Sequence, residues 1–330
     1  MTVATIRYID AINSALAGEM KRDDSVIVLG EDVTLGGPFG ATKGLSEEFG
    51  DDRVINTPIA EGTVMGLAAG AAMLGARPIL EVMFIDFITL AMDQLVNHAA
   101  KLHYMTGGQA VVPLTIRALC GAGGGFGAHH SQSLEAWFLH VPGLKVVAPS
   151  NPADAAGLLR SAVRDNNPVL FLEHRGLYWR KAEVTEDAIP VPLGMASVAR
   201  QGGDLTIVAV SKMVEVALAA ADDLSDSGIE AEVIDLRSIV PLDREAILAS
   251  VRRTGRLVVV HEAVTFGGIG AEIAAMAQEH AFAHLVAPVQ RVGAPFAPVP
   301  ASVELEKIFV PGPDDVIAAA RRTMTAEGVR

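Results

Sequence analysis

The chain lacks several features that would place it in a specialised class of protein. It has one cysteine, Cys120, so no disulfide can form within the chain, and we expect a reducing, cytoplasmic location. Only 5% of its 330 residues are aromatic, so the core must be built mainly from Ala, Val, Leu and Ile. Its most apolar stretches, residues 62–75 and 269–277, fall well short of the roughly 20 residues that a membrane span needs. We therefore expect no membrane partner.

Positive charge is also in short supply. The chain has 26 Lys and Arg against 39 Asp and Glu, a formal net charge of −13. This excess argues against nucleic acid or an anionic membrane surface as the main partner, because both are themselves negative. Half of the residues are hydrophobic, as in globular proteins, and the length suggests two domains that each bury a core of their own.

Short apolar strands alternate with helical patterns along most of the chain. The segment SVIVLG at residues 25–30, for example, is typical of a buried strand. Continuous apolar strands between helices indicate a parallel sheet covered on both faces. The alternation breaks over residues 173–203, which we interpret as an extended crossing, and it restarts at Asp204. We expect an α/β protein with two doubly wound domains, residues 1–185 and 204–330, joined by a linker at 186–203.

The individual elements follow from the same patterns. Asn151 before Pro152 predicts a helix start, because Asn is a good N-cap and proline suits the first helical position. Expected strands cover residues 25–30, 78–84, 114–119, 145–148, 169–172, 205–210, 231–235, 256–261 and 289–292. Expected helices cover residues 9–20, 63–73, 87–105, 151–164, 213–224, 243–254 and 272–282, with a last one after Pro313.

One candidate for chemistry is Glu61, in the segment NTPIAEG at residues 56–62. It precedes the helix expected at 63–73, so its carboxylate would sit near the positive end of the helix dipole. Spacing alone favours the simpler interpretation, an acidic residue that satisfies free backbone amides, since acids are enriched there. Its neighbours Ile59 and Ala60 are apolar and allow a partly desolvated carboxylate.

A second candidate is the glycine-rich segment GAGGGFG at residues 121–127, followed by His129 and His130. It comes after a strand, where ligands of parallel sheets usually bind. No Gly-Lys-Ser/Thr follows, so it is not a P-loop, and the histidines form no zinc motif. The turn RDNNP at residues 164–168 ends a helix. Its side chains and freed carbonyls could hold a hard cation or simply close the turn.

Taken in order, these and further segments carry a resemblance over essentially the whole chain. The segments are VLGEDV (28–33), FGATKGLSEEFG (39–50), NTPIAEG (56–62), EVMFIDF (81–87), MDQLVNHAAKLHYMTGG (92–108), HSQS (130–133), PGLKVVAPSNPADAAGLL (142–159), RDNNPV (164–169), EVIDLRSIVPLD (232–243) and TGRLVVVHEA (254–263). Together they resemble the β subunit of the thiamine-diphosphate-dependent E1 component of 2-oxo acid dehydrogenase complexes. That family has pyruvate, acetoin and branched-chain members. The resemblance implies a pyrimidine-binding domain followed by a transketolase C-terminal-like domain.

The resemblance also implies roles for matching residues. Glu61 matches the family glutamate that contacts N1′ of the aminopyrimidine ring of thiamine diphosphate. Phe87 matches the aromatic residue that packs on this ring, and Ile59 and Met83 match other walls of the pocket. His130 matches the active-site histidine that acts during acyl transfer to the lipoyl group.

A structural potassium site is implied as well. Val112, Leu114 and Ala162 would contribute backbone carbonyls to it, and Asp165 and Asn167 match its remaining positions.

One part of a thiamine-diphosphate site is missing from the sequence. Such enzymes anchor the diphosphate and Mg²⁺ through a Gly-Asp-Gly segment, and none occurs here. In this family the α subunit supplies that half, so the chain would share its cofactor with α in an α₂β₂ heterotetramer. The lipoyl and subunit-binding domains of an E2 acyltransferase are the further partners implied. The expected activity is oxidative decarboxylation of a 2-oxo acid, or cleavage of acetoin, with reductive acylation of a lipoyl group. The substrate within this class stays open.

Two alternatives remain at this stage. A small subunit of a split transketolase would share Glu61 but transfer ketol groups between sugar phosphates. A non-catalytic assembly module would only dock to an acyltransferase core. The presence of both Glu61 and His130 argues against the assembly module, because a scaffold needs neither.

Overall fold

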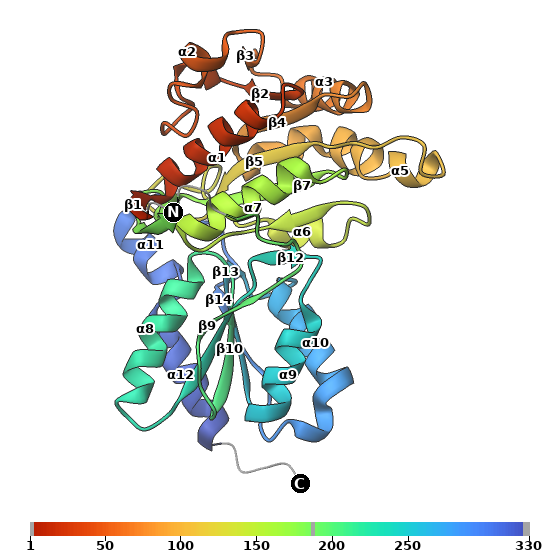
Figure 1. The fold of residues 1–330 in the computed structure, drawn as a ribbon. Coiled ribbons are helices and arrows are strands. Elements are labelled where there is room, and N and C mark those ends of the chain that lie inside the picture. The colour runs from red at the N-terminus through yellow and green to blue at the C-terminus, as the bar shows by residue number, and fades with distance from the viewer. Residues whose placement is uncertain (1–2, 186–188, 326–330) are drawn as a thin grey trace. The chain divides into compact units, whose positions relative to one another are not determined.

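The computed structural model describes residues 3–185 and 189–325, which form two compact units (Figure 1). The N-terminal unit comprises Met1–Cys120 and Trp137–Leu193, and the C-terminal unit comprises Gly121–Ala136 and Gly194–Arg330. The chain therefore enters the C-terminal unit briefly, with the glycine-rich segment, before it returns to the N-terminal unit. The expected domain limits at residues 185 and 204 stay a prediction, and residues 186–188 of the expected linker lie outside the described residues.

The N-terminal unit contains parallel strands in the order β6-β7-β5-β4-β2-β3. Their bounds are β2 (Val26–Gly30), β3 (Val54–Asn56), β4 (Arg77–Phe84), β5 (Thr115–Cys120), β6 (Lys145–Val147) and β7 (Val169–His174). The chain runs from β2 to β3 on one side and then to β4 on the other. The switch point of this doubly wound sheet thus lies at the carboxyl ends of β2 and β4, where ligands bind in such folds.

Helices of this unit bury the faces that their patterns predict. In α1 (Tyr8–Arg22), the residues Ile9, Ile12, Leu16 and Met20 are buried, and α1 packs against α7 (Pro152–Arg164). The Asn151 side chain accepts a hydrogen bond from the Asp154 N–H at 2.9 Å, so the predicted N-cap is confirmed. The other helical segments are α2 (Leu45–Phe49), α3 (Glu61–Met73), α4 (Ile85–Ile88), α5 (Leu102–Met105), α6 (Glu135–Leu139), and the short turns η1 (Val33–Leu35) and η4 (Arg175–Leu177).

The prediction of one long helix over residues 87–105 is wrong. This stretch is divided into α4, a 3₁₀ turn η2 (Thr89–Ala91), a π-helical segment η3 (Asp93–Ala99) and α5. The break coincides with close packing against α3. A Cβ on Gly62 would lie 3.0 Å from the Leu90 carbonyl oxygen, and one on Gly66 would lie 3.4 Å from the Gln94 side chain. Such tertiary contacts favour local changes of helical pitch that the residue pattern does not reveal.

The segment 173–203, expected to be an extended crossing, includes the end of β7 and the strands β8 and β9. β8 (Lys181–Thr185) pairs antiparallel with β1 (Val3–Arg7), and β9 (Ser197–Arg200) pairs antiparallel with β11 (Ala231–Asp235). Pairing between segments so far apart in the chain leaves no local signature, which explains why the pattern missed them.

The C-terminal unit is the second doubly wound sheet that the sequence predicts. Its strand order is β14-β13-β10-β11-β9, with all pairs parallel except that of the edge strand β9. Its strands are β10 (Leu205–Ala209), β11 (Ala231–Asp235), β13 (Leu257–Val264) and β14 (Gln290–Ala294), with a short β12 (Ser238–Val240). Its helices are α8 (Met213–Ser225), α9 (Arg244–Thr254), α10 (Ile269–Ala281), α11 (Val303–Phe309), α12 (Pro313–Thr325) and the turn η5 (Phe282–His284). Figure 1 shows α8 and α12 beside each other on one side of the sheet and α9 and α10 on the other.

The buried apolar side chains form the cores of these two units. Among the described residues, no helix has both the length and the apolar character needed to cross a membrane.

Candidate active site

The carboxyl edge of the N-terminal sheet brings three chain segments together. The strand register places Gly30, the end of β2, opposite Asn56 of β3 and Glu81 of β4. The Thr57 N–H donates to the Gly30 carbonyl at 2.9 Å, and the Thr34 N–H donates to the Asn56 side chain at 3.1 Å. The loops after β2 and β3 are thereby tied to each other at the switch point.

Glu61 is the first residue of α3 and is half-buried. The N-cap residue, Ala60, supplies no side-chain hydrogen bond, so the Glu61 carboxylate is the acidic group of the first turn. Glu31, directly after β2, has a pKa raised above its usual value, first by burial and then by the negative charges of Glu61 and Asp32. The structure therefore places two carboxylates within electrostatic reach at this edge.

The apolar residues predicted for the pocket lie in the same unit. Phe87, on α4, packs edge-to-face with Phe84 at a centroid distance of 5.9 Å. Phe87 and Met83 are half-buried against the core of the unit, whereas Ile59 is 79% exposed. An aminopyrimidine ring would require a carboxylate, an aromatic face and aliphatic side chains, and residues of these types are present in this unit.

Within residues 3–185 and 189–325, no group of three or more His, Cys, Asp or Glu side chains is arranged to hold a metal ion.

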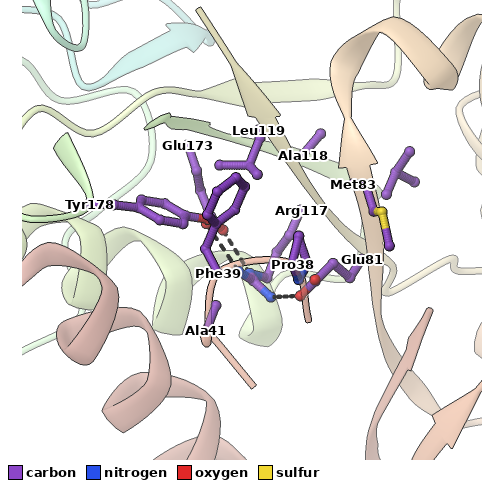
Figure 2. A pocket seen from close by; sticks show the side chains of 11 residues that line it. Pro38, Phe39, Ala41, Glu81, Met83, Arg117, Ala118, Leu119, Glu173 and Tyr178 are labelled. Carbon is purple, nitrogen blue, oxygen red and sulfur yellow. Dashed lines mark hydrogen bonds and ion pairs between the residues drawn. The ribbon is translucent and has the colours of Figure 1, made fainter. Parts of the chain in front are cut away.

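Beneath the edge lies a buried charge network that the sequence analysis did not assemble (Figure 2). The Arg117 guanidinium donates to Glu81 at 2.6 Å and to both oxygens of Glu173 at 2.7 and 3.0 Å. The Tyr178 hydroxyl donates to Glu173 at 2.5 Å. Glu81 is an acid inside an apolar strand, so its burial requires a partner. Its cation is Arg117, the residue directly opposite it in the register of the next strand, β5.

The network has a marked effect on proton binding. Burial raises the pKa of Glu81 above its usual value, although the Arg117 charge opposes this. Burial and the Glu173 charge both raise the pKa of Tyr178. The four side chains line a cavity of about 10 Å³ together with Phe39 and Met83. That volume has room for roughly one water molecule, so we assign the cavity a structural role.

His130 lies in the C-terminal unit, in the segment that follows the glycine-rich loop. Its backbone N–H donates to the Gly127 carbonyl at 3.3 Å, and the residue is half-buried, whereas its neighbour His129 is exposed. Glu61 and His130 thus belong to different units.

The predicted cation site gathers around the end of α7. The carbonyls of Val112, Leu114 and Ala162 each accept one backbone hydrogen bond, at 2.8, 2.9 and 3.2 Å. A carbonyl oxygen has two lone pairs, so each retains one for a cation.

The carboxylate of this site is already engaged. Asp165 forms an ion pair with Lys145 and accepts hydrogen bonds from the Asn167 backbone at 2.9 Å and side chain at 3.1 Å. Burial would raise the pKa of Asp165, but Lys145 and Asn167 together lower it. Arg77 also donates to the Asp165 carbonyl at 3.1 Å. Potassium binding here stays a prediction, and it would depend mainly on the carbonyls.

Two family models match successive parts of the chain. Residues 4–180 match the family described as "Transketolase, pyrimidine binding domain", and residues 194–316 match "Transketolase, C-terminal domain". A solved structure titled "Split gene transketolase, inactive beta4 tetramer" aligns with a TM-score of 0.81 at 26% identity, covering 98% of this chain and 99% of that one.

Curated relatives are more similar in sequence. The β subunit of acetoin:2,6-dichlorophenolindophenol oxidoreductase from Cupriavidus necator is 48% identical, covering 95% of this chain and 96% of the relative. The pyruvate dehydrogenase E1 β subunit of Rickettsia felis is 47% identical, with 95% and 96% covered. The 2-oxoisovalerate dehydrogenase β subunit of Bacillus subtilis is 46% identical, with 97% and 98% covered. The chain therefore belongs to the E1 β-subunit family of 2-oxo acid and acetoin dehydrogenases, a family of oxidoreductases with transketolase-like domains.

Proposed function

We propose that this chain is the β half of a thiamine-diphosphate-dependent E1 enzyme that acts on a 2-oxo acid or acetoin and acylates a lipoyl group. The observation that carries the proposal is the position of Glu61. Glu61 is the first residue of α3, and its charge contributes to the raised pKa of Glu31, which directly follows β2. The named relatives act on pyruvate, acetoin or 2-oxoisovalerate, and the substrate of this chain is drawn from that class.

Glu61 is proposed to hold and exchange a proton at N1′ of the aminopyrimidine ring. When bound, thiamine diphosphate supplies the electron sink that decarboxylation of a 2-oxo acid requires. The task of the protein is to keep a carboxylate within hydrogen-bond reach of the ring nitrogen. The first turn of α3 fixes the backbone of Glu61, because the Val64 N–H donates to the Ala60 carbonyl at 2.9 Å.

Phe87, Met83 and Ile59 are proposed to orient the same ring and to exclude water from it. Phe87 is held by its edge-to-face contact with Phe84, so its position is set before any ligand binds. Ile59 is 79% exposed and thus has an apolar surface available for a ligand or for a neighbouring subunit.

His130 is proposed to orient or protonate the acceptor during acyl transfer to the lipoyl group. It requires an approach from outside the chain, because the lipoyl group arrives on another protein. A half-buried side chain on a loop after a strand end meets this requirement.

The remaining half of the site is proposed to come from an α subunit. It would supply the diphosphate and Mg²⁺ anchor within an α₂β₂ heterotetramer, and E2 would dock to the assembly through its lipoyl and subunit-binding domains. The outer side of α3 supports the need for a partner, since Leu67 is 60% and the following Leu74 is 91% exposed. Potassium at the Asp165 turn and a cytoplasmic location stay predictions.

The main test is the substitution Glu61→Gln in the chain assembled with its α partner. Turnover would be measured with pyruvate, 2-oxoisovalerate and acetoin, using a dye as electron acceptor. We expect a loss of at least about 100-fold with unchanged circular dichroism, because an amide cannot exchange the proton. Glu47→Gln, an exposed acid on α2, is the matched control and should keep full activity.

Two results would contradict the proposal. Near wild-type turnover of Glu61→Gln would remove the role of this carboxylate. Ketol transfer between sugar phosphates by the unaltered assembly, without turnover of oxo acids or acetoin, would favour a split transketolase instead.

A separate test addresses His130. His130→Ala should slow acylation of a lipoyl domain more than it slows dye reduction, because the dye reaction does not need the lipoyl group. His129→Ala, its exposed neighbour, should affect neither reaction. Equal losses in both reactions for His130→Ala would exclude a specific role in acyl transfer.

A further inference from the structure

The glycine-rich segment before His130 forms a closed loop whose backbone only glycine adopts readily. Gly121, Gly123 and Gly125 have φ values of +83°, +127° and +73°. The Gly121 N–H donates to the Gln132 carbonyl at 3.1 Å and closes the base of the loop. A turn of this kind directs several N–H groups to one side, and these groups need acceptors.

The acceptors are two buried carboxylates that lie far away in the sequence. The N–H groups of Gly123 and Gly125 donate to the two oxygens of Glu306 at 2.7 and 3.1 Å. The Ala122 N–H donates to Glu262 at 2.6 Å. Glu306 is only 4% exposed and Glu262 only 8%. We call Glu262 and Glu306 the carboxylate clamp.

The clamp explains why the loop is rich in glycine. A Cβ on Gly125 would lie 2.8 Å from the Ala301 carbonyl oxygen, and one on Gly127 would lie 3.3 Å from the Ala301 Cβ. The loop therefore rests directly on the segment that leads into α11, the helix that carries Glu306. Any side chain at these positions would lift the loop off its carboxylate acceptor.

Burying the two carboxylates of the clamp is energetically unfavourable, which argues that they have a specific role. Burying a carboxylate removes its hydration, and the usual compensation is a nearby cation. Among the described residues, no Lys, Arg or His forms an ion pair with Glu306. Its carboxylate is instead held by backbone N–H groups of the loop. Charge-assisted hydrogen bonds of this kind are strong and directional, and they suit the precise placement of a loop.

We propose that Glu262 and Glu306 are positioning residues that hold the loop from which His130 is presented. The proposal rests on the function proposed above for His130. The connection is short, since the His130 N–H donates to the carbonyl of Gly127, the last glycine of the clamped loop. Release of Glu306 would free two amides, let the loop move and misplace the histidine that follows it.

The test uses Glu306→Gln in the αβ assembly, with Glu304→Gln as the matched control. Glu304 lies on the same helix, but its side chain is 79% exposed and pairs with Lys307 at 3.0 Å. Glu306→Gln should slow lipoyl acylation by about 10- to 100-fold, as expected when a catalytic group is displaced by about 1 Å. Amide hydrogen exchange of residues 121–127 should become faster in the same variant. The control should change neither quantity.

A double-mutant cycle with His130→Ala separates positioning from general damage. If Glu306 acts through His130, its substitution should cost little further activity once His130 is gone. An equal loss in both backgrounds would overturn the proposal, and so would full activity in Glu306→Gln with unchanged hydrogen exchange. Glu262→Gln provides a second variant if Glu306→Gln fails to assemble, and it is expected to behave in the same way.

The cycle also keeps this inference distinct from the proposed function. If His130→Ala alone keeps full lipoyl acylation, the proposed role of His130 is wrong. Hydrogen exchange of the Gly123 and Gly125 amides then still decides whether Glu306 holds the loop.

Discussion

The two units share a doubly wound fold, and each buries an ionisable side chain in a different kind of environment. The N-terminal unit buries Arg117 between Glu81 and Glu173, so that charges of both signs are paired. The C-terminal unit buries His261, which is 0% exposed, and neither ring nitrogen has a hydrogen-bond partner of normal geometry among the described residues. The first arrangement pairs buried charges of opposite sign, whereas the second favours an uncharged ring.

The surroundings of His261 explain how the ring is accommodated. A Cβ on Gly268 would lie 2.4 Å from its Cε1, and one on Gly270 would lie 3.0 Å from its Nε2. The ring thus fills the space left by glycines at the start of α10. Burial lowers the pKa of His261 to about 4, and contact with the Ala263 backbone only partly opposes this. We therefore expect the N-terminal unit to lose stability when one side chain of the Arg117 network is removed. We expect the C-terminal unit to lose stability in acid.

The largest expected effect is the loss of Arg117. Arg117→Met leaves two buried carboxylates without a cation, so we expect the free energy of unfolding to fall by about 3–5 kcal/mol. Urea denaturation at neutral pH measures it. Arg321→Met, at an exposed position of α12, is the control and should change the free energy of unfolding by less than about 0.5 kcal/mol. A loss below about 1 kcal/mol for Arg117→Met would show that the network matters little for stability.

The next effect is the acid sensitivity contributed by His261. Its pKa is about 4 in the folded chain against an ordinary 6.5, so the unfolded chain binds a proton first as pH falls. The stability contributed by the uncharged ring is fully present above pH 6.5 and is lost progressively between pH 6.5 and 4. The total loss in the free energy of unfolding is about 3 kcal/mol. Denaturation across this range should show a flatter profile for His261→Leu than for the unaltered chain. His284→Leu, at an exposed site, should keep the original slope.

A smaller effect is expected for a second paired acid of the N-terminal unit. Glu19 is 1% exposed and accepts hydrogen bonds from Arg164 at 2.6 and 3.0 Å and from Arg22 at 2.8 Å. Burial opposes ionisation, but the two arginines lower the pKa of Glu19, so its contribution is lost as pH falls below about 4.5. Glu19→Gln should cost about 1 kcal/mol at neutral pH. Glu48→Gln, from the exposed pair with Lys21, should cost almost nothing, and equal losses would contradict the distinction between buried and exposed pairs.

The smallest effect is expected at the potassium site. Replacing potassium by a large organic cation at fixed ionic strength should lower the melting temperature by about 2 °C, since a bound ion stabilises only the folded state. Lys145→Met removes the cation that pairs with Asp165 and should increase this dependence on potassium. Identical melting temperatures in potassium, sodium and the organic cation, for both proteins, would exclude a bound ion.

Local features were predicted from the sequence because their causes are local. The Asn151 cap of α7 and the apolar face of α1 depend on residues within a few positions of one another. The expected helix at 87–105 failed because its pitch responds to α3, a different part of the chain. Glu61 was recognised through its motif, and the structure adds Glu31 as its electrostatic neighbour.

What the sequence by itself determined is the alternation of strands and helices, the α/β class, the family and the candidates Glu61 and His130. What only the tertiary structure decided is which distant residues pair with one another. Glu262 lies 140 residues from the loop amide that it binds, and Glu306 lies 183 and 181 residues from its two amides. Arg117 finds its carboxylates on two neighbouring strands. The physical reason is that buried charges are satisfied by whatever the fold brings within hydrogen-bond distance. That pairing depends on strand register and loop packing, which no local pattern of residues encodes.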